Sequence, residues 1–452
     1  MNGSKHFLGA LLLLLLLSCA SSQQVVAPVV KPDEVTHSPA PPAEAEDTLV
    51  VHPADSFRLK DHYTIALILP LFLDSLREIS DSIPPSYYAD SEMGVEFYLG
   101  ALLALDSLKK NGFRARVYVF DDANTAERLR DIAHHPAMKH TDWVIGPIYN
   151  NNLRLMAEYA KRDSFYLISP LSPADNITQK NPYYIMVNPG VGIHCEKLFD
   201  FVVSHFAQDH IVLLFRPGVE QEYASIFRKL LRKYHQDTGN YGLQFTEVNY
   251  GGIMQTDSGS LALLLDSSRN NVIIIPSVDK AYVHNLARDL FPLTRPSEGT
   301  MAAESYRITV VGLPVWGDQS VMLFEYVNAL QVHFTSSFYV PDTFYSMNNP
   351  FYREYVSRYY NEPSEYAVKG FDMVLFFGKM LQRYGKDFGS MLTAVADTAF
   401  HTQFRFGLHL DESPASPFFS ADTVQRPVVI QYIENKYLHL LKYQDNYLIK
   451  ME

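Results

Sequence analysis

The segment Thr64-Ile-Ala-Leu-Ile-Leu-Pro-Leu71 is an uninterrupted apolar run of strand length that ends at a proline and a leucine. A strand that is apolar on both faces is typical of a parallel sheet with helices on each side. A helix is expected next, and residues 92–111 supply its pattern: apolar residues recur every three or four positions, and Gly112 follows as a stop signal. The folded region therefore begins with a strand–helix unit.

The same alternation continues along the chain. Further strands are predicted at 114–120, 143–146, 165–168, 211–215, 245–250, 272–276 and 308–312. Helices are predicted between them at 125–134, 150–161, 192–206, 220–235, 258–267 and 279–290. Because parallel strands joined by helices need right-handed crossovers, the pattern predicts an α/β protein with two doubly wound, three-layer lobes joined by crossover strands.

The domain boundaries follow from this series. The first lobe is expected to comprise residues 61–188 and 342–395, and the second lobe residues 189–341 and 396–452. The chain would pass between the lobes near Asn188 and again between Tyr339 and Asp342. Near the C-terminus, two alternating apolar segments on either side of Asn435 predict a hairpin.

The N-terminus carries a targeting signal. Residues 7–17 form an apolar run of about 16 Å as a helix, roughly half of a hydrocarbon core, so residues 1–18 are predicted to be a signal peptide. Leu16-Leu17-Ser18-Cys19 resembles the bacterial lipobox, which predicts lipidation of Cys19; ordinary signal cleavage is the alternative. The Pro- and Ala-rich residues 19–60 read as a disordered tether. Ala20 favours anchoring at the outer membrane of the cell envelope, facing the periplasm, by analogy with lipoproteins.

Composition excludes several classes of function. The 452 residues leave room for two or three domains, and 38 Lys+Arg against 50 Asp+Glu give a formal charge of −12, which argues against a nucleic-acid partner. Once Cys19 is lipidated, Cys195 is the only remaining thiol, so no intrachain disulfide is expected. Cys195 follows His194, which suggests either a nucleophile and its base or a buried core residue. Adjacent helical residues point in different directions, which favours the core.

Other motifs for chemistry are lacking in the sequence. Gly190-Val-Gly192 has no third glycine, and the histidines at 134, 135 and 140 have no accompanying Cys or carboxylate motif. The chain contains no Gly-x-Ser-x-Gly elbow, Walker loop or His-Glu-x-x-His motif. The sequence therefore predicts a protein that is not an enzyme and that uses no metal and no cofactor.

From about Tyr63 onward the chain resembles the type 1 periplasmic binding proteins, the two-lobed fold that includes leucine-binding proteins. The segments that carry the resemblance are Gly94 to Asp106 (Gly-x5-Gly-Ala-x2-Ala-x-Asp), Ile145-Gly-Pro147, Ile168-Ser-Pro170, Asn181-Pro-Tyr183, Asn349-Pro-Phe-Tyr-Arg-Glu-Tyr355 and the helix 366–381. The resemblance implies that the two lobes face one another across a ligand-binding cleft.

Ligands of open α/β sheets bind at the carboxyl ends of the strands. By that rule the walls of the cleft come from the loops at 70–74, 149–151, 171–173, 219–223, 277–280 and 314–318. The candidate ligand-binding residues are Tyr149, Asn150, Asn151, Leu171, Ser172, Tyr223, Trp316 and Asp318. Core packing is the alternative for the aromatic residues, and capping of the following helix is the alternative for the two asparagines.

The candidate site departs from the pattern of the amino-acid binders that it resembles. Where those proteins have a hydroxyl, an acidic residue and an aromatic residue, this chain has Pro173, Pro314 and Val278, and Tyr223 alone matches its counterpart. An ammonium without an acidic partner in a closed cleft costs several kcal/mol. A free amino acid is therefore not the expected ligand, unless Asp318 or Asp74 substitutes for the acidic group.

Two functions from different classes follow. The first is a solute-binding lipoprotein that closes on a small polar ligand and is read by a transporter or sensor. The second is an outer-membrane lipoprotein scaffold that regulates a peptidoglycan synthase, because activators of penicillin-binding proteins contain a similar domain. The missing ammonium acceptor and the long tether favour the second, and the absence of a helical-repeat domain weakens it.

Overall fold

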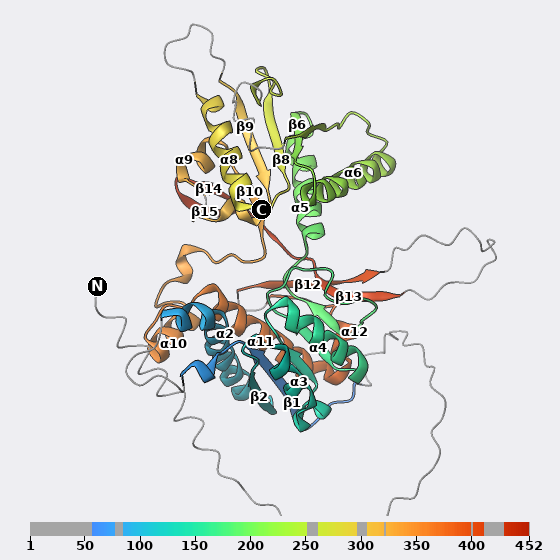
Figure 1. The fold of residues 1–452 in the computed structure, drawn as a ribbon, viewed down its shortest axis with the longest axis vertical. Coiled ribbons are helices and arrows are strands. Elements are labelled where there is room, and N and C mark those ends of the chain that lie inside the picture. Colours follow the sequence, from blue (N-terminus) through green and yellow to red (C-terminus); the bar gives the residue numbers. More distant parts are fainter. Residues whose placement is uncertain are drawn as a thin grey trace, which may run out of the picture.

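The computed structural model describes residues 57–76, 85–250, 261–295, 305–320, 322–398, 401–410 and 429–451. The predicted signal peptide, Cys19 and all but the last residues of the predicted tether lie outside the described residues, as do the first three residues of the predicted helix 258–267. The described residues form two α/β lobes, which lie one above the other in Figure 1. None of the helices in the described ranges is both long enough and apolar enough to span a bilayer.

The first lobe is built on an eight-stranded sheet. Its strand order is β11 (Ala396–Thr398), β12 (Gln403–Leu410), β13 (Ile430–Asn435), β5 (Tyr184–Met186), β4 (Tyr166–Ser169), β3 (Trp143–Ile145), β1 (Tyr63–Leu69) and β2 (Ala115–Asp121). The strands from β13 to β2 are parallel, whereas β11, β12 and β13 pair antiparallel. From Ile65 to Leu69, strand β1 is buried on both faces, as its apolar sequence predicts.

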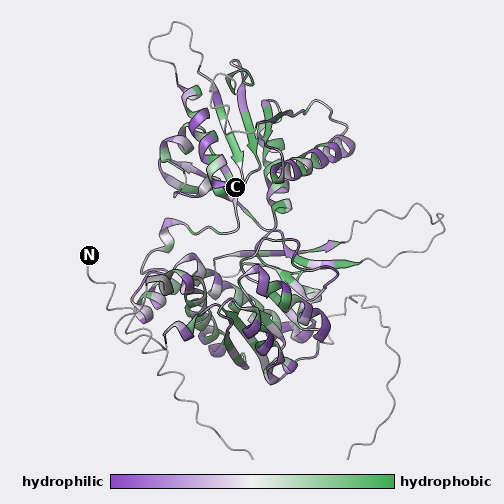
Figure 2. Cartoon of the chain, viewed as in Figure 1, coloured by the Kyte–Doolittle hydropathy of each residue, from purple (hydrophilic) through white to green (hydrophobic). Residues whose placement is uncertain are grey.

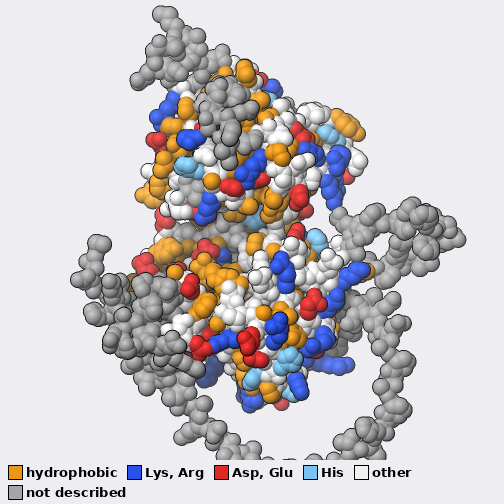
Figure 3. Space-filling model, in the orientation of Figure 1, with side chains coloured by type: hydrophobic (Ala, Val, Ile, Leu, Met, Phe, Trp, Pro, Cys, Tyr) orange, Lys and Arg blue, Asp and Glu red, His pale blue; other side chains and the backbone are white. Residues whose placement is uncertain are grey.

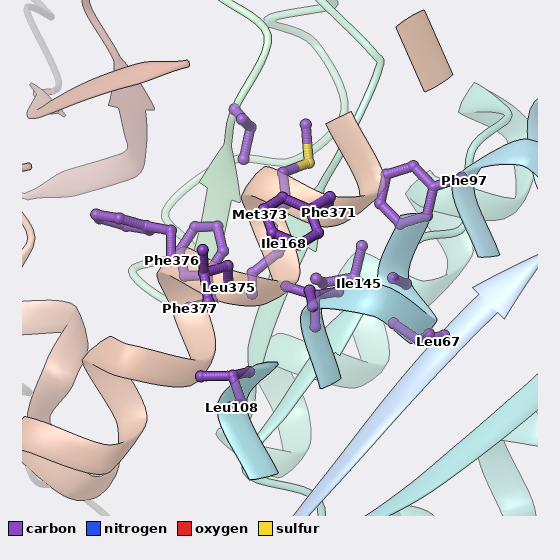
Figure 4. Close-up of a cluster of buried hydrophobic side chains, with 14 of the residues drawn as sticks. Leu67, Phe97, Leu108, Ile145, Ile168, Phe371, Met373, Leu375, Phe376 and Phe377 are labelled. Carbon is purple, nitrogen blue, oxygen red and sulfur yellow. The ribbon is translucent and has the colours of Figure 1, made fainter. Parts of the chain in front are cut away.

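Helices cover both faces of this sheet. One face carries α2 (Pro85–Lys110), α10 (Pro350–Tyr359), α11 (Glu365–Tyr384) and α12 (Phe388–Met391), and the other carries α3 (Ala126–His134) and α4 (Asn150–Asp163). Side chains of β1 alternate between the two cores: Ile65 and Leu67 face α2 and α11, whereas Ala66 and Ile68 face the α3 and α4 side. Figure 4 shows the first of these cores, where Phe97 and Leu108 of α2 lie among the phenylalanines of α11.

The second lobe is built on a seven-stranded sheet. Its order is β15 (Tyr447–Met451), β14 (His439–Gln444), β10 (His333–Ser336), β9 (Arg307–Gly312), β8 (Asn270–Ile275), β6 (His210–Phe215) and β7 (Thr246–Asn249). Helices α5 (Val191–Phe206) and α6 (Val219–Thr238) cover one face, and α8 (Lys280–Leu290) and α9 (Phe324–Ala329) cover the other. In both lobes the hydrophobic residues concentrate in the strands, and outer helices such as α6 are largely hydrophilic (Figure 2).

The predicted alternation of strands and helices is therefore confirmed in the described residues, with two departures. Of the described part of the predicted helix 258–267, only residues 261 and 262 are helical, and one helix begins earlier than predicted. Helix α2 begins at Pro85, several residues before the apolar periodicity that starts at 92. Proline is well suited to the first position of a helix because it has no N–H to leave unpaired. The polar first turns of α2 carry no apolar period, so the sequence pattern could not show where the helix begins.

The C-terminal residues divide between the lobes differently from the expected boundary. Residues 396–452 were expected in the second lobe, but β11, β12 and β13 extend the first sheet, and only β14 and β15 join the second. The chain therefore crosses between the lobes three times: after β5, after β10 and after β13. Strand β13 pairs in parallel with β5, where Ile433 lies opposite Ile185, so an apolar strand edge of the first lobe is covered.

The prediction of a hairpin around Asn435 is also wrong, because the C-terminal strands divide between the two lobes. Strands β13 and β14 lie in different sheets, and Asn435 ends β13 at the third crossing. Its side-chain oxygen accepts hydrogen bonds from the backbone N–H groups of Arg405 (3.0 Å) and Tyr437 (3.1 Å), and its amide donates to Val187 O (3.1 Å). Asn435 thus joins two of the three crossing segments instead of forming a turn.

The second lobe also contains buried histidines that should make its stability depend on pH. Burial lowers the pKa of His194, His333 and His439 to about 4 in each case, against about 6.5 in an unfolded chain. Between these values the unfolded state binds more protons, so stability is retained above pH 6.5 and is lost as the pH falls towards 4. Each histidine contributes a slope of up to about 1.4 kcal/mol per pH unit.

We therefore expect the free energy of unfolding, measured by urea denaturation, to fall steadily from pH 6.5 to pH 5. His333 packs against Phe201 and Phe206, so His333→Phe should keep the packing and flatten this pH dependence. The matched control is replacement of the exposed His140 by Phe. Equal slopes for wild type and His333→Phe would show that His333 is not a source of the effect.

Candidate functional site between the lobes

A cavity of about 570 Å³ lies where the two lobes meet the crossing segments. Figure 3 shows the molecule narrowing between the lobes in this region. The wall residues come from both lobes and from the crossings: Pro173, Asn188, Pro189, Val191, His194, Val278, Leu313, Pro314, Val315, Gly317, Asp318, Phe334, Ser336, Ser337, Phe338, Glu365, Lys369, Leu441 and Leu448. The volume is within the range of small-molecule sites.

The second-lobe wall is centred on the loop after β9. This loop forms the short 3-10 helix η4 (Pro314–Gly317) and ends at Asp318. The Asp318 carboxylate accepts hydrogen bonds from Ser320 N (2.9 Å) and Ser320 Oγ (2.6 Å) and forms an ion pair with Lys280 (2.6 Å). Lys280 and Ser320 hold the pKa of Asp318 below its usual value, so this wall presents a carboxylate that is charged and already paired.

The first-lobe wall is provided by the start of α11. Ser364 caps this helix by accepting a hydrogen bond from Ala367 N, and Glu365 and Lys369 follow on one face. The Lys369 ammonium lies 2.6 Å from a Glu365 oxygen and 5.4 Å from the centroid of the Phe338 ring. A pair of opposite charges and one aromatic face therefore meet on this side of the cavity.

The floor of the cavity is formed by the crossing segments. Asn188 donates a hydrogen bond to Leu171 O (2.7 Å), and Gly190 N donates to a Glu434 oxygen (2.9 Å). His194 Nδ1 lies 2.8 Å from Thr335 Oγ1. The first two bonds connect the entry to α5 with residues of the first lobe, whereas the contact between His194 and Thr335 lies within the second lobe.

The structure brings one of the predicted ligand-binding residues to the cavity wall, Asp318, together with Pro173, Val278 and Pro314 from the predicted loops. Asp74, the other proposed substitute for the acidic group, forms an ion pair with Arg128 on the first lobe. Trp316 is fully buried beneath Gly312 in the second-lobe core, which corresponds to the packing alternative for this residue. Leu171 and Ser172 lie two residues and one residue before the wall residue Pro173, and neither lines the cavity.

Tyr149, Asn150 and Asn151 lie at the start of α4, outside the cavity wall. Tyr149 occupies the N-cap position, so neither asparagine caps the helix. The buried amide is instead that of Asn152, which donates to an Asp122 oxygen (2.7 Å) and to Thr125 O (3.3 Å). These contacts tie α4 to the loop after β2.

Tyr223 is half-buried on α6 against the second-lobe core and is not a wall residue of the cavity. The nearby loops are held by a charged network. Arg216 donates to Glu220 (2.8 Å) and Asp279 (2.9 Å), and Ser277 Oγ donates to Glu220 (2.7 Å). This network joins the carboxyl ends of β6 and β8 through bonds among their own side chains.

The His194–Cys195 pair does not form a catalytic arrangement. Cys195 is fully buried in the second-lobe core, and burial raises the pKa of its thiol. The His194 ring contacts Thr335. Within the part of the chain that the structure describes, no group of three or more side chains could hold a metal ion.

Sequence reasoning missed Lys369, Glu365 and the segment 336–338. A signal for Lys369 was present, because this residue interrupts the apolar stretch of the helix 366–381. That helix was identified by family resemblance, and its residues were not considered individually as candidate binding residues. The segment 336–338 carries no comparable motif.

The fold was compared with known proteins. A putative branched-chain amino acid ABC transporter from Rhodospirillum rubrum is similar, with a TM-score of 0.57 and 13% identity over 86% of this chain and 99% of that chain. An ABC transporter substrate-binding protein from Desulfitobacterium hafniense in complex with Leu has a TM-score of 0.52 and 14% identity, covering 86% and 100%. Full-length LpoA from Haemophilus influenzae has a TM-score of 0.50 and 12% identity, covering 87% of this chain and 60% of LpoA.

No protein-family model and no curated protein matches the sequence. Likenesses at 12–14% identity show the fold alone. The two sheets with their covering helices and crossings agree with those structures over most of the chain. This chain therefore has the fold of the type 1 periplasmic binding proteins and is structurally similar to ABC transporter substrate-binding proteins.

Proposed function

We propose that the protein is an extracytoplasmic solute-binding lipoprotein, anchored through Cys19, that closes its lobes on a small ligand for a transporter or sensor. The observation that carries this proposal is the cavity of about 570 Å³ with walls from both lobes. A ligand shifts an open–closed equilibrium only if it binds the closed form better. Contacts with both lobes provide that preference, because closure brings the two walls together.

A second candidate function is regulation of a cell-wall synthesis enzyme by an outer-membrane scaffold whose cleft no longer binds a solute. Two observations favour it. Pro173, Val278 and Pro314 offer no side-chain donor or acceptor at positions where the resembled binders have polar or aromatic groups. In addition, the charged side chains of Arg216, Glu220 and Asp279 at the second-lobe strand ends bond to one another.

Obstruction of the cavity separates these functions. Ser337 lines both the main cavity and a small one beside it, so Ser337→Trp fills space that a solute would occupy. We expect native mass spectrometry of the purified wild-type protein to detect a bound small molecule that is lost in Ser337→Trp. The matched control is Ser204→Trp, on the exposed face of α5, which should retain the molecule. Melting temperatures of both variants establish that they are folded.

Retention of the small molecule by folded Ser337→Trp would contradict the site assignment. A wild-type protein that carries no small molecule but recovers a peptidoglycan synthase in a pull-down, equally with Ser337→Trp, would support the scaffold function instead.

A further inference from the structure

Lys369 is the partly buried cation of the cavity wall. Its side chain is only 12% exposed, and it lines both the cavity of about 570 Å³ and the cavity of about 10 Å³ beside it. A lysine ammonium in such a position requires a negative partner, because removing the charge from water is costly. The identity and exchangeability of that partner therefore determine what the site can bind.

The present partner, Glu365, is easily replaced. Its side chain is 47% exposed, and it meets Lys369 as an i,i+4 pair on one helix. Only the carboxylate end of this pair is open to solvent, so Glu365 regains its hydration when it leaves Lys369. Glu365 also lies in the first turn of α11, where the helix dipole favours a negative charge even without Lys369. An anion that enters the cavity can therefore replace Glu365 as the ion-pair partner of Lys369, while the Glu365 side chain rotates into solvent.

The opposite wall does not offer a cation the kind of available partner that Lys369 offers an anion. Asp318 already accepts from three donors, Lys280 Nζ and the Oγ and N of Ser320. His194 is buried beside Thr335 and carries no charge near neutral pH. An ammonium would have to compete with three donors for Asp318, whereas an anion displaces one exposed carboxylate. The wall thus favours an acid over an amine or an α-amino acid.

Most of the remaining wall is apolar. Val191, Leu313, Phe334 and Leu441 of the second lobe face this space, and Phe338 of the second crossing lies beside Lys369. Apolar walls stabilise an apolar ligand body by removing its surface from water. The charged group and the apolar surface lie on different sides of the same cavity.

We infer that the cavity binds a small amphipathic acid, with one anionic group held by Lys369 and an apolar body against the second-lobe wall. This inference rests on the proposed solute-binding function. It names a ligand class that differs from the zwitterionic amino acids by the absence of an ammonium group.

Two matched series of probes test the inference by isothermal titration calorimetry at pH 7.5. The first series is hexanoate, hexanamide, hexylamine and norleucine, and the second is phenylacetate, phenylacetamide and phenylethylamine. We expect at least one of the acids to bind about 10-fold or more tightly than its amide, its amine and, for hexanoate, norleucine. Lys369→Met should weaken binding of that acid about 10-fold, whereas Lys233→Met, which removes an exposed lysine of α6 outside the cavity wall, should not weaken it.

A further variant separates anion binding from a structural role of Lys369. Glu365→Gln removes the competing carboxylate, so it should tighten binding of the acid about 2-fold or more. Equal binding of acid and amide, stronger binding of norleucine, no binding of either acid, or no response to Lys369→Met would each overturn the inference. If a neutral or zwitterionic molecule co-purifies with the wild type and is lost in Ser337→Trp, the inference fails while the solute-binding function stands.

Discussion

Gly100→Ala is expected to lower the free energy of unfolding by about 3 kcal/mol or more. Helices α2 and α11 pack with their backbones in close approach: a Cβ at Gly100 would overlap the carbonyl group of Ala367, and a Cβ at Gly370 would overlap that of Phe97. Because backbone atoms cannot rotate away as a side chain does, a single methyl group must push the helices apart. The core between the helices and the sheet, shown in Figure 4, would then lose its close packing.

The measurement is urea denaturation followed by circular dichroism. Gly192→Ala serves as the matched control, because Gly192 also lies in a helix but a Cβ there would meet no atom within 4 Å. Alanine is the better helix former, so Gly192→Ala should leave stability unchanged or raise it by up to about 1 kcal/mol. A Gly100→Ala protein as stable as wild type would show that the α2–α11 contact can relax at little cost.

Asp121→Asn is expected to cost about 2–3 kcal/mol and to loosen the loop at residues 70–74. The Asp121 carboxylate accepts four backbone N–H groups, from Leu71 (2.9 Å), Phe72 (3.1 Å), Leu73 (2.8 Å) and Ala123 (2.9 Å). It also holds Phe72 at a φ of 52°, which is unfavourable for a residue with a side chain. An amide has one acceptor oxygen instead of two, so some of these N–H groups lose their partner.

Two observables identify this effect. Denaturation should show the loss of stability, and hydrogen exchange should show faster exchange of the amides of residues 71–73. Asp131→Asn, at an exposed position on α3, is the control and should change neither. If amide exchange in residues 71–73 stayed at the wild-type rate in Asp121→Asn, the carboxylate would not be what holds the loop.

The fold was largely predictable because the deciding signals are local. Each buried parallel strand carries its own apolar run, and each covering helix has its own period, so the segment 64–71 predicts β1 without knowledge of its neighbours. The sheet that a strand joins is not determined by the strand's local sequence. The alternating pattern of residues 430–435 indicates a strand but does not say that β5 is its partner, and β13 was therefore expected in the other lobe.

The candidate site was less predictable, because exposure and pairing depend on the whole fold. Asp318 was identified from its place after a strand end, and it does lie in the cavity wall. Trp316, from the same loop, could equally line a site or fill the core, and the close approach of its ring to Gly312 places it in the core. Lys369 stands out in the apolar stretch of its helix, but its place in the cavity wall depends on where the start of α11 lies relative to the second crossing, which no local pattern contains.

The late position of β13 has a consequence for biogenesis. A polypeptide emerges from the ribosome, or from an export channel, with its N-terminus first. Strands β1 to β5 are available early, but β13, which covers the edge of β5, follows only after the whole second-lobe helical series has been delivered. At about 5–20 residues per second this delay is on the order of tens of seconds. During that time the unpaired edge of β5 can pair with a strand of another chain. Products truncated before residue 430 should therefore aggregate unless a chaperone binds them.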